Sequence, residues 1–170
     1  MNDFETTDQA LRISLALQPD LAETLGRLAV LRWSQGDVAG TARALDQTHV
    51  SAPNNHHLLR LRARFSRQTG KLDAALADID RVIALADPHW DDFITRGDFS
   101  IAHGRLDAAD AAYARAGALN PSAAKVHLHR ADAAARGNRF DTASNLLDRT
   151  QLIRPDLVAI YLNRGNAHFA

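Results

Sequence analysis

Residues 88–121 read PHWDDFITRGDFSIAHGRLDAADAAYARAGALNP, and this stretch is one of several imperfect copies of a single pattern. A Gly or Asn in the middle of each copy recurs every 34 residues along the chain, at Asn2, Gly36, Gly70, Gly104 and Asn138. A repeat of this length is typical of stacked supersecondary units, none of which can bury its apolar face without a neighbour. The sequence therefore predicts an open array with a long surface, on which binding is expected and catalysis is not.

Each copy contains two segments with apolar residues at helical spacing, joined by a tight turn. The first segments are expected to be helical over 21–35, 55–69, 88–103, 123–136 and 157–169. The second segments are expected to be helical over 5–17, 38–50, 72–85, 106–119 and 140–153. We therefore expect one all-α solenoid of about ten helices in antiparallel pairs. Its units are a partial repeat over 1–19, full repeats over 20–53, 54–87, 88–121 and 122–155, and a truncated repeat over 156–170.

We call a set of equivalent positions in successive repeats a column. Two such columns mark the ends of the helices. The glycine column lies between the paired helices, where a left-handed backbone is needed and Asn is the next-best residue. A proline column lies between the units, at Pro19, Pro53, Pro121 and Pro155. The residues after these prolines are expected to cap the next helix, and they are Asp20, Asn54, Ser122 and Asp156. In the remaining unit Asp87 is expected to be the cap, with Pro88 at the first helical position.

Small side chains recur where the two helices of a unit are expected to touch. On the first helices they are Ala29, Ala63, Gly97, Ala131 and Gly165. On the second helices they are Thr41, Ala75, Ala109 and Ala143. Small residues at regular positions allow helix backbones to approach closely, which favours the all-helical interpretation.

Composition excludes several classes of protein. The chain has no Cys, so disulfides and thiolate metal sites are excluded. Its formal net charge is zero, which argues against general binding of nucleic acid or of a membrane surface. The first residues show neither a basic segment nor an apolar run of the kind that directs secretion, so a cytoplasmic location is expected. Arg far outnumbers Lys and Asp far outnumbers Glu, which hints at a bacterial genome rich in GC.

These columns resemble the tetratricopeptide repeat, which combines a large apolar residue, Leu-Gly, an Ala before an aromatic residue, and Pro. In the best copy the pattern reads Phe93, Arg96-Gly97, Ala109, Tyr113 and Pro121, with Arg in place of Leu. The resemblance covers essentially the whole chain. It implies a right-handed superhelix whose first helices line a concave groove, and it implies protein or peptide binding without catalytic activity or cofactor.

Three arginines of the unit over 54–87 are expected on the groove side of its first helix. Arg60, Arg64 and Arg67 are separated by one helical turn each, so they share one helix face. Neighbouring units add further candidate groove residues, which are Arg27, Trp33, Thr95, Lys125, His129 and Asn163. Trp33 fits two roles equally, since it could anchor a ligand at the groove rim or cover the junction with the preceding helix.

The arrangement partly resembles the clamp of basic and Asn residues with which some members of the family hold the C-terminal carboxylate of a peptide. Arg60, Lys125 and His129 match basic or polar positions of that clamp, and Arg64 and Thr95 stand where it has Asn. Asn163 matches a clamp Asn, but in a different group of three units. Three carboxylates on comparable faces are expected to neutralise the patch in part, and they are Asp91, Asp98 and Asp132.

Other polar residues have a structural interpretation. An arginine recurs once per repeat at Arg62, Arg96, Arg130 and Arg164. We expect these side chains to pack between helices and to reach carboxylates such as Asp78 or Asp110. No pair of histidines has the spacing that a metal site on one helix requires, so no metal is expected. His127, which replaces an apolar residue of its column, is expected to be packed and hydrogen-bonded.

The sequence thus predicts a non-catalytic scaffold that binds a peptide or partner protein in its groove. An alternative is a regulatory or substrate-recruiting arm of a larger bacterial enzyme, since some sulfotransferases and glycosyltransferases carry similar arrays. Another is a homodimer formed through the last helix, whose apolar residues Tyr161, Leu162 and Phe169 are expected to lack a covering partner. RNA binding through the arginine stripe is disfavoured by the zero net charge.

Overall fold

The computed structural model describes residues 22–85 and 88–157, together with Gln9 and Ile13. Eight helices lie within the ranges described. The first helices of the units are α2 (Ala22–Ser34), α4 (His56–Gln68), α6 (Trp90–Ala102) and α8 (Ala124–Arg136). The second helices are α3 (Val38–Ser51), α5 (Leu72–Leu85), α7 (Leu106–Leu119) and α9 (Phe140–Ile153). The bounds predicted for these helices are confirmed closely, and only isolated residues of the terminal helices expected at 5–17 and 157–169 are described.

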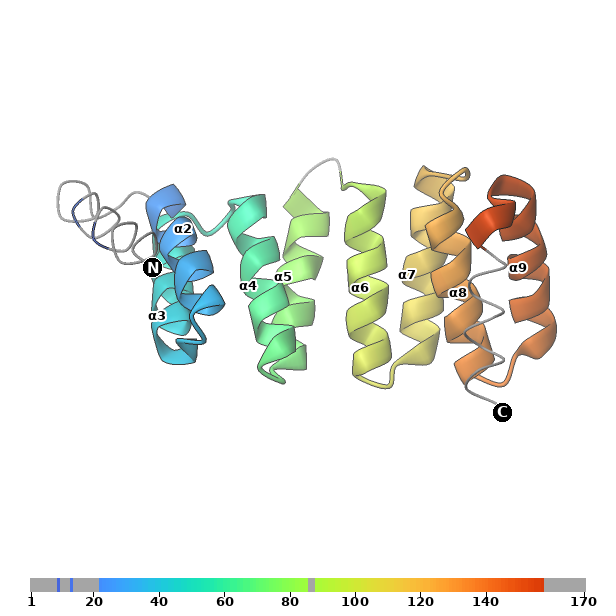
Figure 1. Cartoon of the computed structure of the whole chain (residues 1–170), viewed down its shortest axis with the longest axis horizontal. Coiled ribbons are helices and arrows are strands. Elements are labelled where there is room, and N and C mark those ends of the chain that lie inside the picture. Colours follow the sequence, from blue (N-terminus) through green and yellow to red (C-terminus); the bar gives the residue numbers. More distant parts are fainter. Residues whose placement is uncertain (1–8, 10–12, 14–21, 86–87, 158–170) are drawn as a thin grey trace.

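The helices stand side by side in chain order and form one elongated row (Figure 1). Each first helix packs against the second helix of its own unit, and successive units meet through the next first helix. The first helices α6 and α8 also touch each other directly. The predicted all-α solenoid of antiparallel pairs is therefore confirmed for the described part of the chain.

The turn between the helices of each unit has the backbone that the glycine column predicts. Gly36, Gly70 and Gly104 have φ of 76°, 77° and 74°, and Asn138 has φ of 58°. This left-handed region is open to glycine and is tolerated by Asn better than by most other residues. Turns of one conformation give helix pairs of one geometry.

The helices of each unit touch at the small residues, as predicted. Ala29, Ala63, Ala75 and Ala109 are completely buried, as is Thr41. Gly97 has the tightest contact, because a Cβ built on it would lie 2.2 Å from Cε1 of Tyr113. The other described units have Leu or Ile where this unit has Tyr113, so glycine compensates for the larger ring.

Apolar residues between adjacent units form separate clusters, not one continuous core. One cluster joins α2, α3 and α4 through Ala29, Leu45 and Phe65, with Trp33 packed against it. The Trp33 ring meets the Phe65 ring edge-on, with 5.6 Å between the ring centroids. Trp33 therefore covers the junction between its own unit and the following one, whereas the expected contact was with the preceding helix, most of which lies outside the described residues.

The helix caps at the junctions between units do not lie at the residue after the proline, as predicted, but one residue later or not at all. Each described proline of the column occupies the second position of a tight turn, closed by hydrogen bonds from the amides of Asn55, Ala123 and Leu157. The residue after the proline is used by the turn, so Asn54 and Ser122 are not the caps. The cap of α4 is Asn55, and α8 begins after Ala123 without a side-chain cap.

The other predicted caps also differ from the structure. α6 is capped by His89, whose Nδ1 accepts a hydrogen bond from the amide of Asp91. Pro88 therefore lies before the helix and not at its first position. The carboxylate of Asp156 is bound by Arg154, while Asp20 and Asp87 lie outside the described residues.

The joints along the row are unequal. The contact between α3 and α4 is much smaller than the contact between α5 and α6 or between α7 and α8. The first described unit is therefore attached less extensively than the others.

We expect Gly97→Ala to lower the free energy of unfolding by about 1–3 kcal/mol, because the added methyl group overpacks the contact with Tyr113. The Tyr113 hydroxyl is hydrogen-bonded to Asp98 at 2.7 Å, so the ring has little freedom to withdraw. Gly117→Ala is the matched control, because its Cβ would meet only Cγ1 of Val126, at 3.4 Å. There the gain in helix propensity should raise stability by about 0.5–1 kcal/mol. Urea denaturation measures both changes, and equal effects would contradict the interpretation.

Candidate functional site

Two hollows lie side by side on the face formed by the first helices. One, of about 550 Å³, lies between α2 and α4 and is lined by Gly26, Arg27, Val30 and Leu58 among others. The other, of about 490 Å³, lies between α4 and α6 and is lined by Arg60, Leu61, Arg64 and Thr95 among others. His57 lines both hollows, so they form one groove, which we call the first-helix groove.

Arg60 is held inside the groove by a carboxylate of the next unit. Its Nε and Nη2 donate hydrogen bonds of 2.6 and 2.7 Å to the two oxygens of Asp92. Asp92 is only 4% exposed, and it also accepts a hydrogen bond from the backbone amide of His89. The hydrogen bonds with Asp92 raise the pKa of Arg60 above its usual value despite partial burial. This pair fixes α4 against the start of α6.

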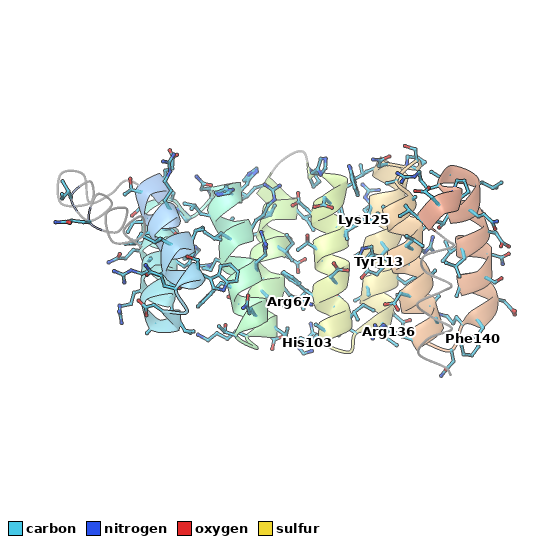
Figure 2. The ribbon with its side chains drawn as sticks, in the orientation of Figure 1. Arg67, His103, Tyr113, Lys125, Arg136 and Phe140 are labelled. Carbon is cyan, nitrogen blue, oxygen red and sulfur yellow. The ribbon has the colours of Figure 1, made fainter. Side chains whose placement is uncertain are left out.

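A second pair joins α6 to α8. Nζ of Lys125 lies 3.0 Å from Oδ1 of Asp91, and both side chains are about half exposed. The Thr95 hydroxyl donates a hydrogen bond of 3.0 Å to the backbone oxygen of Asp91. Figure 2 labels Lys125 on the row of helices.

A third contact links three helices through one carboxylate. Asp98 of α6 accepts a hydrogen bond from the Tyr113 hydroxyl of α7 and lies 2.9 Å from Nδ1 of His129 on α8. Burial opposes ionisation of Asp98, but hydrogen bonds from His129 and Tyr113 outweigh it and lower its pKa. Burial and the hydrogen bond to Asp98 raise the pKa of Tyr113, so the phenol stays protonated and donates.

Arg64 differs from the other arginines of the groove. Arg27 pairs with Glu23 one turn earlier on α2, and Arg60 is bound by Asp92. Arg64 is exposed, and no hydrogen bond or ion pair joins it to another residue of the described ranges. Among the arginines that line the two hollows it is thus the one whose charge is available to a ligand.

Arg67 and Asn163 complete the set of predicted groove residues. The guanidinium carbon of Arg67 lies 5.8 Å from the centre of the Phe99 ring, which places this cation over an aromatic face of α6. Asn163 lies outside the described residues. The structure therefore brings Arg60, Arg64 and Thr95 together in one hollow and places Arg67 farther along the same helix.

Solved structures with the same arrangement of helices are known. The chain matches MamA with a TM-score of 0.81 at 18% identity, over 93% of this chain and 92% of that one. It matches YrrB, a TPR protein with an unusual peptide-binding site, with a TM-score of 0.79 at 16% identity, over 96% and 84%. The fold is that of the tetratricopeptide repeat. PilW, a widely conserved type IV pilus biogenesis factor, matches with a TM-score of 0.74 at 14% identity, over 89% and 70%.

The likeness predicted from the sequence is therefore confirmed for the fold. No protein-family model matches the sequence, and no curated protein sequence matches it significantly.

The basic and polar residues that match the carboxylate clamp are paired with carboxylates of the chain itself. Asp92 binds Arg60, Asp91 binds Lys125, and Asp98 binds His129. All three carboxylates belong to α6. The predicted partial neutralisation of the basic patch is confirmed for Asp91 and Asp98, whereas Asp132 pairs with Arg136 of its own helix. Asp92, which was not among the carboxylates expected to take part, binds Arg60 instead.

The recurring arginines between the helices have the predicted structural role. Arg62 pairs with Asp78, Arg96 pairs with Asp80, and Arg130 pairs with Asp110. Each guanidinium reaches a neighbouring second helix while its stem packs between helices. Within the described ranges these arginines hold helices together. Arg164 lies outside those ranges.

Nothing in the described part of the array points to a metal or to membrane insertion. There, no group of three His, Asp or Glu side chains is arranged to hold a metal ion. No helix within those ranges is long and apolar enough to cross a bilayer. His127 is partly buried, with Nε2 3.3 Å from the Pro121 oxygen, whereas its Nδ1 is buried without a hydrogen-bond partner among the described residues.

Sequence analysis missed several groove residues that the repeat columns could have revealed. His57 shares a column with Asp91 and Lys125, and Val30 shares one with Arg64. Reading these columns across all units would have placed both residues in the groove. His89 shares its column with Asn55, which caps α4 and lines the other hollow, so the same comparison would have placed His89 beside the groove.

We expect Asp92→Ala to lower the free energy of unfolding by about 2–4 kcal/mol, because it leaves Arg60 without its buried partner and removes a capping interaction. Asp91→Ala is the control on the adjacent residue, since its exposed pair with Lys125 should contribute about 0–1 kcal/mol. Urea denaturation of both variants measures the difference. A cost for Asp92→Ala as small as that for Asp91→Ala would contradict the proposed role of the buried pair.

Asp98 should make the array sensitive to acid. Because the pKa of Asp98 is lowered in the folded state, its ionised form stabilises the fold above about pH 4, the usual aspartate pKa. This contribution is lost as the pH falls through the lower folded-state pKa. We therefore expect Asp98→Asn to be less stable than wild type at neutral pH and to lose less stability on acidification. Asp148→Asn, which replaces an exposed carboxylate of α9, should follow the wild-type profile in urea denaturation.

Proposed function

We propose that this tetratricopeptide array is a non-catalytic scaffold that binds a peptide segment of a partner protein in the first-helix groove. The observation that carries this proposal is the pair of adjoining hollows, with one cation, Arg64, left unpaired within the described ranges. Leu61 supplies apolar surface to the hollow that contains Arg64, and Val30 and Leu58 supply it to the other. Apolar pockets with a few fixed polar groups are typical of ligand sites.

The dimensions of the groove suit a short segment. Directly packed helices lie about 8–10 Å apart. Neither α2 nor α6 is packed closely against α4, so these three first helices span at least about 16–20 Å. An extended chain advances about 3.3 Å per residue, so at least about five or six residues would cover the two hollows. The ligand segment can continue over α8 towards Lys125 and His129.

The charge of the groove changes along its length. The column that contains Arg64 on α4 continues with Asp98 on α6 and Asp132 on α8. Asp98 lies against His129, and Asp132 pairs with Arg136, so both carboxylates of this column already have partners within the array. A ligand with an acidic residue over α4 would be favoured, and such complementarity sets register and orientation more than total affinity.

The test uses peptides selected from a random library of about twelve residues, a length that spans the groove when extended. Selected peptides are measured by fluorescence anisotropy against wild type and Arg64→Glu. Since a hydrogen bond to a charged group is worth about 1.5–3 kcal/mol, we expect Arg64→Glu to weaken acidic peptides by about tenfold or more. Arg60→Glu is unsuitable for this test, because the new carboxylate would face buried Asp92.

Arg115→Glu is the matched control, because it makes the same charge change on an exposed residue of the second helix α7. It should leave the affinity for groove peptides unchanged. Selected peptides that all bind Arg64→Glu as tightly as wild type would contradict the proposal that they bind in the first-helix groove.

A further inference from the structure

A third hollow lies on a different surface of the array. It has a volume of about 450 Å³ and opens between the second helices α7 and α9, over α8. We call it the second-helix cleft. Its α8 residues include His127 and Arg130, which lie on the opposite side of that helix from Lys125 and His129. Binding in the second-helix cleft would therefore be independent of the first-helix groove.

Three residues that line the second-helix cleft differ from their counterparts one unit earlier. Ala114, Gly117 and His127 take the positions that Asp80, Ile83 and Phe93 have in the preceding repeat. In the earlier unit Ile83 packs against the apolar cluster, and Asp80 binds Arg96. At the next junction the aliphatic side chain of Ile83 is therefore replaced by the hydrogen atom of Gly117.

Packing inside the protein does not require the glycine of this cleft. Gly117 lies within helix α7, and a Cβ at this position would meet only Cγ1 of Val126, at 3.4 Å. Gly97, by contrast, has no room for a Cβ beside Tyr113. A glycine that weakens a helix without relieving a contact breaks a local rule, and such departures concentrate at functional sites.

The lining of the cleft indicates the chemistry of its occupant. The floor and walls are largely apolar and include Gly117, Ala118, Val126 and Leu152. Leu152 is 86% exposed, an unusual state for a large aliphatic side chain at the wall of a hollow. Arg149 lines the cleft, and no hydrogen bond or ion pair joins it to another residue of the part described. An apolar side chain accompanied by a carboxylate complements these features.

We propose that the second-helix cleft is a docking site for a segment of a second protein. This segment inserts one branched aliphatic side chain beside Gly117 and pairs a neighbouring carboxylate with Arg149. The inserted side chain takes the place that Ile83 fills from within the chain one unit earlier. A single buried aliphatic anchor with a flanking charge pair is a common way for an interface to concentrate its binding energy.

The experiment uses the full chain and the same random peptide library, selected on wild type and sorted against Gly117→Ile. This variant fills the cleft in the way that Ile83 fills its counterpart. We expect a class of peptides with Ile or Leu next to Asp or Glu that lose at least about tenfold in affinity for Gly117→Ile. Ala111→Ile adds the same side chain at an exposed position of the same helix and should have no effect.

A second variant, Arg149→Glu, tests the same proposal even if Gly117→Ile folds poorly. Arg149 is exposed, so Arg149→Glu leaves the packing intact, and it should weaken the same peptides by about tenfold. Arg115→Glu, the equivalent change one unit earlier, should not weaken them. Arg64→Glu should also leave them unaffected, which separates this proposal from the one for the first-helix groove.

Two outcomes would overturn the proposal. One is a selection in which every peptide binds Gly117→Ile and Arg149→Glu as tightly as wild type. The other is a wild-type dimer in sedimentation that Gly117→Ile converts to a monomer, since the cleft would then be covered by a second copy of the chain and not by a separate partner.

Discussion

The close approach of the two helices within each unit is the constraint on which the rest of the structure depends. Completely buried alanines at Ala29 and Ala63, and a glycine at Gly97, bring the paired backbones together. Small residues fix the spacing within each helix pair, and one left-handed residue fixes the turn. Equivalent side chains of successive units therefore point in equivalent directions from their helices. Differences between units then lie in the side chains displayed, which is why equivalent positions can be compared across the array.

That comparison shows how the array distributes its charges. The three carboxylates of α6 bind basic groups of both neighbouring first helices, so charges that could have met a ligand instead join one unit to the next. Interactions between units are what stabilise a repeat protein, because each unit alone has too little core. The cohesion of the array and the composition of its groove are therefore set by the same residues, and Arg64 stands out because it takes no part in this pairing.

The sequence was sufficient for nearly all of the fold and for only part of the candidate site. Helix bounds, left-handed turns and small contact residues follow from local periodicity, which a single chain displays directly. The cap at Asn55 was missed because the turn at Pro53 uses one residue more than the motif suggests. The cap at His89 was missed because Pro88 lies before α6 and not at its first position. The partners of Arg60 and His129 were not assigned, since pairing between helices depends on rotamers and distances that no column encodes. The sequence indicates the second-helix cleft only through the Gly117 that replaces Ile83 of the preceding repeat. The volume of the cleft can be known only from the structure.

The limited contact between α3 and α4 has a mechanical consequence. In a row where every unit touches only its neighbours, compliance is the sum of the individual joints, and the least extensive one yields first. We therefore expect the row to flex most readily between its first and second described units, where the contact is least extensive. The hollow between α2 and α4 spans that joint, so we expect its width to vary more than that of the neighbouring hollow.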